Sequence, residues 1–335
     1  MLGFGKPPKL SGEMEGARVV RQRATALGAK VAPCAIAVLA GCSNVVTTSE
    51  APAGSTLAFV TFERYEPASA APSQPAALPE GGAATGTGTR MYASAYFIRL
   101  QAGADEKLAA RLVGAGLTLP EAGHCDVSPS LQDEGIPLAS LGPVDLVDVG
   151  EINVQAGEAR ATLAPRAFPD LVDLVSGVVY TTRESATASL PERGAYRVEV
   201  AGSLTFLPAT LTATAPGPVS GFSVDGVKPE NGSLSVAPGD VTLAWDPAAG
   251  EASLADVVYV ELAPLNDPSA RHTRCTFADT GHGVLSGESL PTWADWSLRV
   301  HRVHREPLVA AAIDGGEIRF DEATTVNLHF AVEGP

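Results

Sequence analysis

Short runs in which apolar and polar side chains alternate recur along most of this chain of 335 residues. A period of two residues is typical of β-strands, because successive side chains on a strand point to opposite faces of the sheet. Apolar stripes with the helical period of about 3.6 residues are hard to find, whereas Gly, Pro, Thr and Val are abundant. The sequence therefore predicts an all-β protein.

The first group of predicted strands lies in an N-terminal domain that spans residues 57–215. Asp105–Val113 is the one segment there with fair helix propensity, and its acidic start suits the first turn of a helix. Arg166–Val175 is a second, shorter helical candidate after Pro169. Neither is long enough to organise the domain, which is expected to be built from strands at Leu57–Tyr65, Met91–Leu100, Val144–Val149, Ala159–Leu163, Val178–Arg183 and Tyr196–Val200.

A segment between the first two of these strands has a different composition. Glu66–Arg90 is rich in Ala, Pro, Gly, Ser and Thr and nearly free of aromatic residues. Such a segment cannot bury enough apolar area to offset the entropy lost on ordering. We therefore expect residues 67–89 to form a disordered loop.

A Pro-rich joint, "TAPGPVSG" at Thr214–Gly221, indicates a boundary before a C-terminal domain of residues 216–335. Short strands with frequent turn signals are typical of an immunoglobulin-like β-sandwich. "APGDVTLAW", Ala237–Trp245, resembles the edge of secreted immunoglobulin-like or fibronectin-like modules, which implies a fold and no activity. With this domain the prediction is two β-sandwich-like domains, the second with strands at Phe222–Val227, Val241–Trp245, Val257–Leu262, His272–Phe277, Trp296–His304, Ile318–Phe320 and Val326–Val332.

The first 41 residues have the layout of an export signal. A short apolar run, Val31–Ala40, is followed by small residues and Cys42, and it is too short for a membrane span of about 20 residues. The stretch before it is basic, with Lys6, Lys9, Arg18, Arg21, Arg23 and Lys30.

Leu39-Ala40-Gly41-Cys42 resembles the lipobox of bacterial lipoproteins. The resemblance implies removal of residues 1–41, with Met14 as an alternative start, and attachment of lipid to the Cys42 thiol. Ser43 after the cysteine implies an outer-membrane position in the cell envelope, and residues 42–56 then form a lipidated tether. The alternative is an ordinary buried helix that ends in Gly-Cys.

The cysteines that remain after this cleavage are Cys42, Cys125 and Cys275, because Cys34 falls in the signal. Cys125 and Cys275 could pair in an oxidising compartment. They also fall in different predicted domains, so both could instead be small buried core residues. The sequence leaves these two alternatives open.

The charge argues against one class of partner. The chain has a formal net charge of −15, and loss of the basic signal makes the mature protein more acidic. Such a surface repels nucleic acid. The one extended basic cluster, Arg299–Arg305, is too small for a face that follows phosphates, so no nucleic-acid partner is expected.

Two motifs suggest chemistry and have simpler interpretations. Asp279-Thr280-Gly281 matches the aspartic-protease triplet, but it occurs once and is also an ordinary hairpin turn, in which Asp279→Asn would alter stability only slightly. His301 and His304 are spaced like ligands of zinc or copper, yet residues three apart on a strand face opposite ways. We therefore expect a turn and two histidines with ordinary partners.

Other searches of the sequence are negative, with no G-x-S-x-G, H-E-x-x-H or phosphate-loop motif. The acidic pairs Asp133-Glu134 and Asp321-Glu322 are interpreted as turn and surface residues, and Trp293 and Trp296 as a core anchor and a lid or a stacking face. We expect no catalytic residue, metal or cofactor. The predicted function is a lipid-anchored binding or structural module for a protein or glycan, and the alternative is a surface hydrolase whose catalytic residues come from scattered loops.

Overall fold

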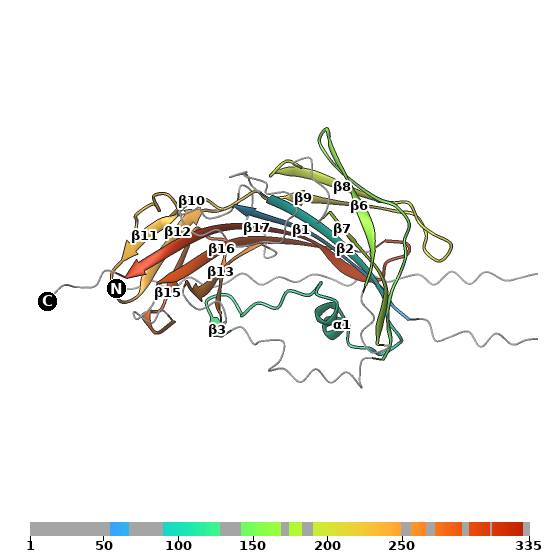
Figure 1. The fold of residues 1–335 in the computed structure, drawn as a ribbon, viewed down its shortest axis with the longest axis horizontal. Coiled ribbons are helices and arrows are strands. Elements are labelled where there is room, and N and C mark those ends of the chain that lie inside the picture. Colours follow the sequence, from blue (N-terminus) through green and yellow to red (C-terminus); the bar gives the residue numbers. More distant parts are fainter. Residues whose placement is uncertain are drawn as a thin grey trace, which may run out of the picture. The chain divides into compact units, whose positions relative to one another are not determined.

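The computed structural model describes residues 54–66, 90–127, 142–168, 174–182, 190–248, 256–265, 272–289, 295–308 and 310–330. The predicted signal peptide, Cys42, nearly all of the tether and the predicted loop at residues 67–89 lie outside these ranges, as do Pro169, Asp133-Glu134 and Trp293. The described part contains seventeen strands and a single α-helix (Figure 1). The all-β prediction is confirmed.

Fourteen of the described strands form one large mixed sheet (Figure 1). The longest strands lie at its centre in the order β13, β16, β17, β1 and β2; β14 and β3 follow beyond β13, and β4, β7, β6, β5, β8 and β9 follow beyond β2. β11 pairs with the end of β17. The bounds are β1 Thr56–Glu66, β2 Arg90–Arg99, β3 Cys125–Val127, β4 Val144–Leu146, β5 Ile152–Ala156, β6 Ala159–Ala167, β7 Val175–Thr181, β8 Gly194–Val200, β9 Ala209–Ala215, β11 Ser233–Val236, β13 Asp256–Pro264, β14 Thr273–Ala278, β16 Trp296–Pro307 and β17 Gly315–Phe330.

A second, three-stranded antiparallel sheet contains β10 (Ser220–Val224), β12 (Val241–Asp246) and β15 (His282–Leu285). It packs against β13, β16 and the end of β17, with Trp245, Val258 and Leu298 in the shared core. Another core, with Phe62, Tyr196 and other residues, lies between β1, β2 and β17 on one side and β5, β8 and β9 on the other. Sandwich-like packing therefore occurs twice.

The two packed regions share strands across the boundary predicted at residues 215/216. β1 pairs in parallel with β17, from Leu57↔Gly315 to Glu66↔Thr324. The first and the last described strands therefore lie side by side at the centre of the large sheet. All described residues belong to one compact unit, Glu50–Pro335. Alternation in a sequence identifies a strand but carries no information about its pairing partner, which is why the pattern suggested two separate domains.

β17 itself also differs from the prediction. The sequence pattern indicated two strands, Ile318–Phe320 and Val326–Val332, separated by acidic and threonine residues. The structure instead has one strand from Gly315 to Phe330, in which Asp321 and Glu322 are buried at 7% and 5% exposure. Their interpretation as surface residues is wrong, because each has charged or polar partners on its own face of the sheet.

The helix α1 (Glu106–Leu112) lies within the predicted segment Asp105–Val113. Asp105 caps its start by accepting a hydrogen bond from the Leu108 backbone N–H at 3.0 Å. Ala109 and Ala110 are buried, and the helix belongs to a third apolar cluster with Leu57 and Ile98. Figure 1 shows α1 and β3 on the opposite side of the long strands from β8 and β9.

Candidate binding site

The face of the long strands that carries α1 is crossed by the segment between α1 and β3. We call residues 114–124 the strap. Arg319 of β17 donates a hydrogen bond from Nη1 to the Ala115 carbonyl at 3.0 Å, and Arg305 of β16 donates from Nη2 to the Leu117 carbonyl at 3.1 Å. Guanidinium groups on successive strands therefore hold successive parts of the strap.

The far end of the strap joins the edge of the large sheet. The Gly123 N–H donates to the Thr276 carbonyl at 2.7 Å, and the Thr276 N–H donates to the His124 carbonyl at 3.0 Å. β3 then continues as the strand next to β14, with Cys125 opposite Cys275. The strap thus begins at α1, which packs against Leu57 of β1, and ends at β3, which pairs with β14.

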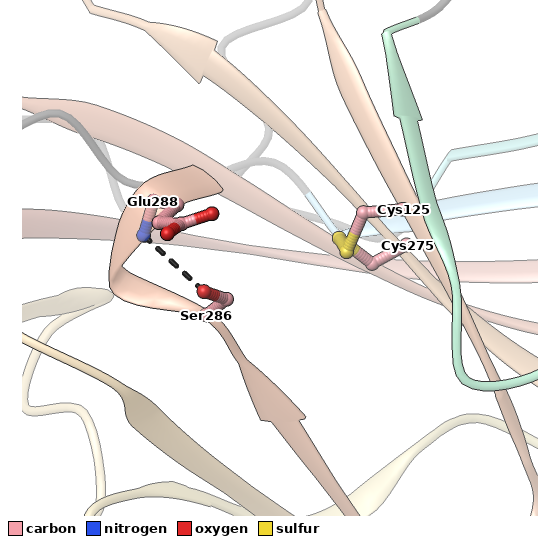
Figure 2. The surroundings of a disulfide bond; sticks show 4 residues. All are labelled: Cys125, Cys275, Ser286 and Glu288. Atoms are coloured by element: carbon pink, nitrogen blue, oxygen red, sulfur yellow. Dashed lines mark hydrogen bonds between the residues drawn. A yellow bond between two sulfur atoms is a disulfide. The ribbon is translucent and has the colours of Figure 1, made fainter.

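A disulfide links Cys125 to Cys275 at this end (Figure 2). Cys275 is fully buried in the core beneath the small sheet, and Cys125 packs against that core from its edge. The objection that these cysteines belong to different domains does not hold, because the strap carries Cys125 to β14. The turn drawn beside the disulfide in Figure 2 follows β15, and there Ser286 Oγ accepts from the Glu288 N–H at 3.3 Å.

A cavity of about 600 Å³ lies between the sheet, α1 and the strap. Its floor comes from β1, β13, β14, β16 and β17 and includes both apolar and polar side chains, and its other walls are the α1 residues and strap residues 116–122. This volume falls within the range of about 300–1,000 Å³ that is typical of small-molecule sites. The floor includes Leu57, Phe59, Val257, Thr276 and Gly316.

Gly316 lines the floor where β17 pairs with β1. Its φ of +125° lies in the region that favours glycine, and a Cβ built there would come within 1.9 Å of the Ala58 carbonyl oxygen. A side chain at this position is therefore incompatible with the parallel pairing of β17 with β1.

Charged side chains gather around this floor. Three basic and two acidic side chains line the cavity, namely Lys107, Arg111, Arg305, Glu106 and Glu317. Glu317 already pairs with Arg319 at 3.2 Å, whereas its distance to the Arg305 Nε is 4.0 Å. The balance of charge at the cavity is positive, in a chain whose net charge is −15.

A row of buried polar side chains continues along the same face. His301 Nδ1 lies 2.6 Å from Asp321 Oδ1, and the Tyr259 hydroxyl donates to Asp321 Oδ2 at 3.2 Å. The rings of Tyr259 and His301 stack with centroids 4.2 Å apart. Burial raises the pKa of the Tyr259 phenol well above its usual value, and the nearby carboxylates of Asp321 and Glu261 act in the same direction.

His301 is buried with Nδ1 paired to Asp321, whereas its Nε2 has no hydrogen bond among the described residues. Its Nε2 lies 3.9 Å from Glu261, which is held by Arg274 through a hydrogen bond of 2.7 Å. The ring is 3% exposed, so a substrate has no path to it. His304 pairs with Asp256 and lies near Phe320, on the opposite face of β16 from His301. The two histidines thus have separate partners on separate faces, as the strand pattern predicts.

Asp279 occupies a buried position that the turn interpretation did not anticipate. It is 5% exposed, pairs with Arg302 Nε at 2.9 Å and accepts a hydrogen bond from the Trp245 indole at 2.7 Å. Arg302 is 1% exposed and also donates to the backbone carbonyls of Pro218 and Asp246. Asp279 therefore balances a buried cation between the two sheets.

The core near β1 contains a further buried pair. Glu322 lies 3.6 Å from Arg64 Nε, and Arg64 also donates to the Leu190 carbonyl at 2.9 Å. Burial raises the pKa of Glu322 to about 7, and the attraction of Arg64 opposes this shift only in part. Charged residues predicted to lie on the surface thus occupy both faces of β17.

Sequence reasoning missed the cavity residues Lys107, Arg305 and Glu317. Arg305 was noted only as part of the basic cluster Arg299–Arg305, and Lys107 only as part of a helix. The pair Cys125 and Cys275 was the one signal that could have brought residues 106–124 close to β14 and β16. Trp296 is buried in the core beneath the small sheet, at 4% exposure.

Within the described residues, no group of three His, Cys, Asp or Glu side chains is arranged to hold a metal ion. The same residues contain no helix with the length and apolar character needed to cross a membrane. Comparison with known proteins found no matching family model and no matching curated protein.

Proposed function

We propose that this chain is an exported protein of the cell envelope, anchored in the outer membrane by lipid on Cys42, that acts as a binding module. Its binding site is the cavity between the strap and the large sheet. The immunoglobulin-like character of residues 216–335 belongs to the same proposal. It is supported by the packing of β10, β12 and β15 on β13 and β16.

The observation that carries this proposal is the disulfide between Cys125 and Cys275. Disulfides persist in oxidising compartments outside the cytosol and are rare within it. This feature is independent of the residues around Cys42, and it supports the same compartment. The disulfide also holds the strap over a cavity of ligand size, which supports a binding role.

The described contacts favour binding over hydrolysis. His301 and Asp321 have the geometry of a base and its orienting carboxylate, but a base needs a reachable nucleophile or water. The described contacts of His301 are with Asp321, Glu261 and Tyr259, and its ring is buried. We therefore assign this group to the packing of the sheet and not to catalysis.

Lipid attachment is tested by expressing the full chain and its Cys42→Ser variant in a bacterial host that processes lipoproteins. The original chain should incorporate labelled palmitate and fractionate with the membrane. The variant should lose both properties, because the thiol is the only atom that can take the lipid. Cys34→Ser is the matched control and should behave as the original chain.

Unchanged palmitate labelling of the Cys42→Ser variant would show that lipid attachment at this residue is wrong. A mature protein whose amino terminus is not residue 42 would contradict the cleavage site. Free thiols at both Cys125 and Cys275 in the exported protein would remove the support for an oxidising compartment.

A further inference from the structure

We infer that the cavity binds an amphipathic carboxylate, a molecule with one aliphatic chain and a single anionic head. This inference rests on the proposed binding function and names the class of ligand. It is carried by the apolar side chains of the floor, the positive excess at the cavity and the attachment of the strap.

The floor fits the chain of such a ligand. Leu57, Phe59 and Val257 present apolar side chains from β1 and β13, and Ala110 of α1 faces the same space. Burial of an aliphatic chain against this surface is favourable because it removes apolar area from water.

The cations fit a single carboxylate. Lys107 is exposed at the start of α1, and it has no acidic partner among the described residues. The Arg305 Nη2 is bound to the Leu117 carbonyl, and no described hydrogen bond satisfies its Nε. Glu317 is engaged by Arg319, so it only partly neutralises Arg305.

The identity of the head follows from this balance. A carboxylate between Lys107 and Arg305 would gain charge-assisted hydrogen bonds, which are roughly twice as strong as neutral ones. A cationic head would be repelled by Lys107 and Arg305, and a neutral head would give Lys107 no counter-charge. The negative charge of the rest of the chain disfavours ligands with several anionic groups.

The strap covers part of the cavity and is fixed to the sheet at several points. The strap is held by Arg319 at Ala115, by Arg305 at Leu117 and by the disulfide at Cys125. In this proposal Arg305 contacts both the strap and the anionic head of the ligand. Bound ligand should therefore hold the strap more firmly against the sheet and slow cleavage of the strap by protease.

The probes are dodecanoate, dodecanol and dodecyltrimethylammonium, which share a chain and differ in the head. Binding is measured by calorimetry on the full chain carrying Cys42→Ser, so that no attached acyl group competes. Dodecanoate should bind about tenfold more tightly than dodecanol, as expected for one charge-assisted hydrogen bond. Dodecyltrimethylammonium should bind more weakly than either.

Two lysine variants form the decisive comparison, because Lys107 and Lys228 are the only lysines after Cys42. Lys107→Glu should weaken the binding of dodecanoate by about tenfold and change the affinity for dodecanol by no more than about twofold. It should not disturb α1, since an acidic residue suits the first turn of a helix. Lys228→Glu makes the same charge change at an exposed residue that does not line the cavity, and it should leave both affinities unchanged.

A third variant locates the site independently of charge. Ala122 is an exposed strap residue that lines the cavity. Ala122→Trp should therefore weaken the binding of dodecanoate and of dodecanol to the same extent, because the larger side chain fills part of the cavity. Near-ultraviolet circular dichroism checks that each variant remains folded. Arg305→Gln should weaken dodecanoate and also make the strap easier to cleave by protease.

Equal affinity for the three probes would overturn the assignment of an anionic ligand. Absence of binding by all three would overturn the ligand class, and tight dodecanoate binding that ignores both Lys107→Glu and Ala122→Trp would overturn the site. These failures are separate from failure of the lipid anchor, which palmitate labelling of Cys42 tests alone.

Discussion

At the scale of residues, the molecule depends on charges buried between its strands. Arg302 and Asp279 join the small sheet to β16, Arg64 and Glu322 lie in the core beside β1, and Asp321 holds His301 on the other face. A buried ion pair contributes little net stability, but removal of one partner leaves an uncompensated charge. Single substitutions at these positions should therefore have large effects.

Asp279→Asn should lower the free energy of unfolding by about 3–5 kcal/mol, because it leaves the buried Arg302 guanidinium without a counter-charge. Urea denaturation measures this loss. Asp145→Asn, at an exposed position of β4, is the matched control and should have an effect within about 0.5 kcal/mol. An equally small effect of Asp279→Asn would favour the simple turn that the sequence suggested.

Glu322 should make stability fall as the pH rises. Its pKa is about 7 in the folded protein against an ordinary value of 4.5, so the folded state holds a proton that the unfolded state has released between these values. The stabilisation is complete below pH 4.5, declines up to about pH 7 and is absent above it. Each pKa unit corresponds to about 1.4 kcal/mol, so the total is up to about 3 kcal/mol.

The glutamine side chain in the Glu322→Gln variant cannot titrate, so this contribution to the decline of stability with rising pH should be absent. Urea denaturation at pH 5 and pH 8 compares the variant with the original chain, and Glu158→Gln, at an exposed turn, serves as the control. The same difference in stability between the two pH values in all three proteins would contradict this role of Glu322.

At the scale of elements, the strap forms the candidate binding cavity on one face of the large sheet. It brings α1, two arginines and β14 together around one cavity, although the cavity residues span from Leu57 to Glu317 in the sequence. Its attachment points are few, namely two side-chain hydrogen bonds, a short backbone pairing and one disulfide.

The double variant Cys125→Ser and Cys275→Ser should lower the free energy of unfolding by about 2–4 kcal/mol, the typical contribution of a disulfide. Limited proteolysis should cut the strap faster in this variant than in the original chain, because only the hydrogen bonds at Ala115 and Leu117 and the short backbone pairing with β14 then hold the strap. Cleavage at an unchanged rate would show that the disulfide does not restrain the strap.

At the scale of the whole molecule, the parallel pairing of β1 with β17 joins the two packed regions in one sheet. The fragment of residues 216–335 has the second sandwich core but lacks β1, which covers Ile318 and Phe320 on β17. It also lacks β3 and the disulfide.

We therefore expect the fragment of residues 216–335 not to fold by itself, whereas residues 43–335 should fold with one cooperative transition. Thermal unfolding followed by circular dichroism makes the comparison. The two-domain interpretation of the sequence predicts the opposite, and a fragment that unfolds cooperatively near the melting temperature of the longer chain would support that interpretation.

The sequence by itself determined the local structure of this protein. Alternation identified β1, β2, β8, β12, β13, β14 and β16, and the acidic start at Asp105 identified α1, because these signals depend on neighbours along the chain. Lipid attachment at Cys42 stays a prediction from local sequence. Strands β3, β5, β9, β11 and β15 were not predicted, and β17 was predicted as two strands because acidic and threonine residues lie in its middle.

Only the tertiary structure decided the pairings. The register of β1 with β17, the contact of Asp279 with Arg302 and the cavity between Lys107 and Arg305 join residues far apart in the chain. A period of two residues assigns a side chain to a face but not to a neighbour, and a charge in a sequence does not reveal whether a counter-charge will meet it. The cavity exists because the strap crosses four strands before Cys125 reaches Cys275, and that path is a property of the folded chain.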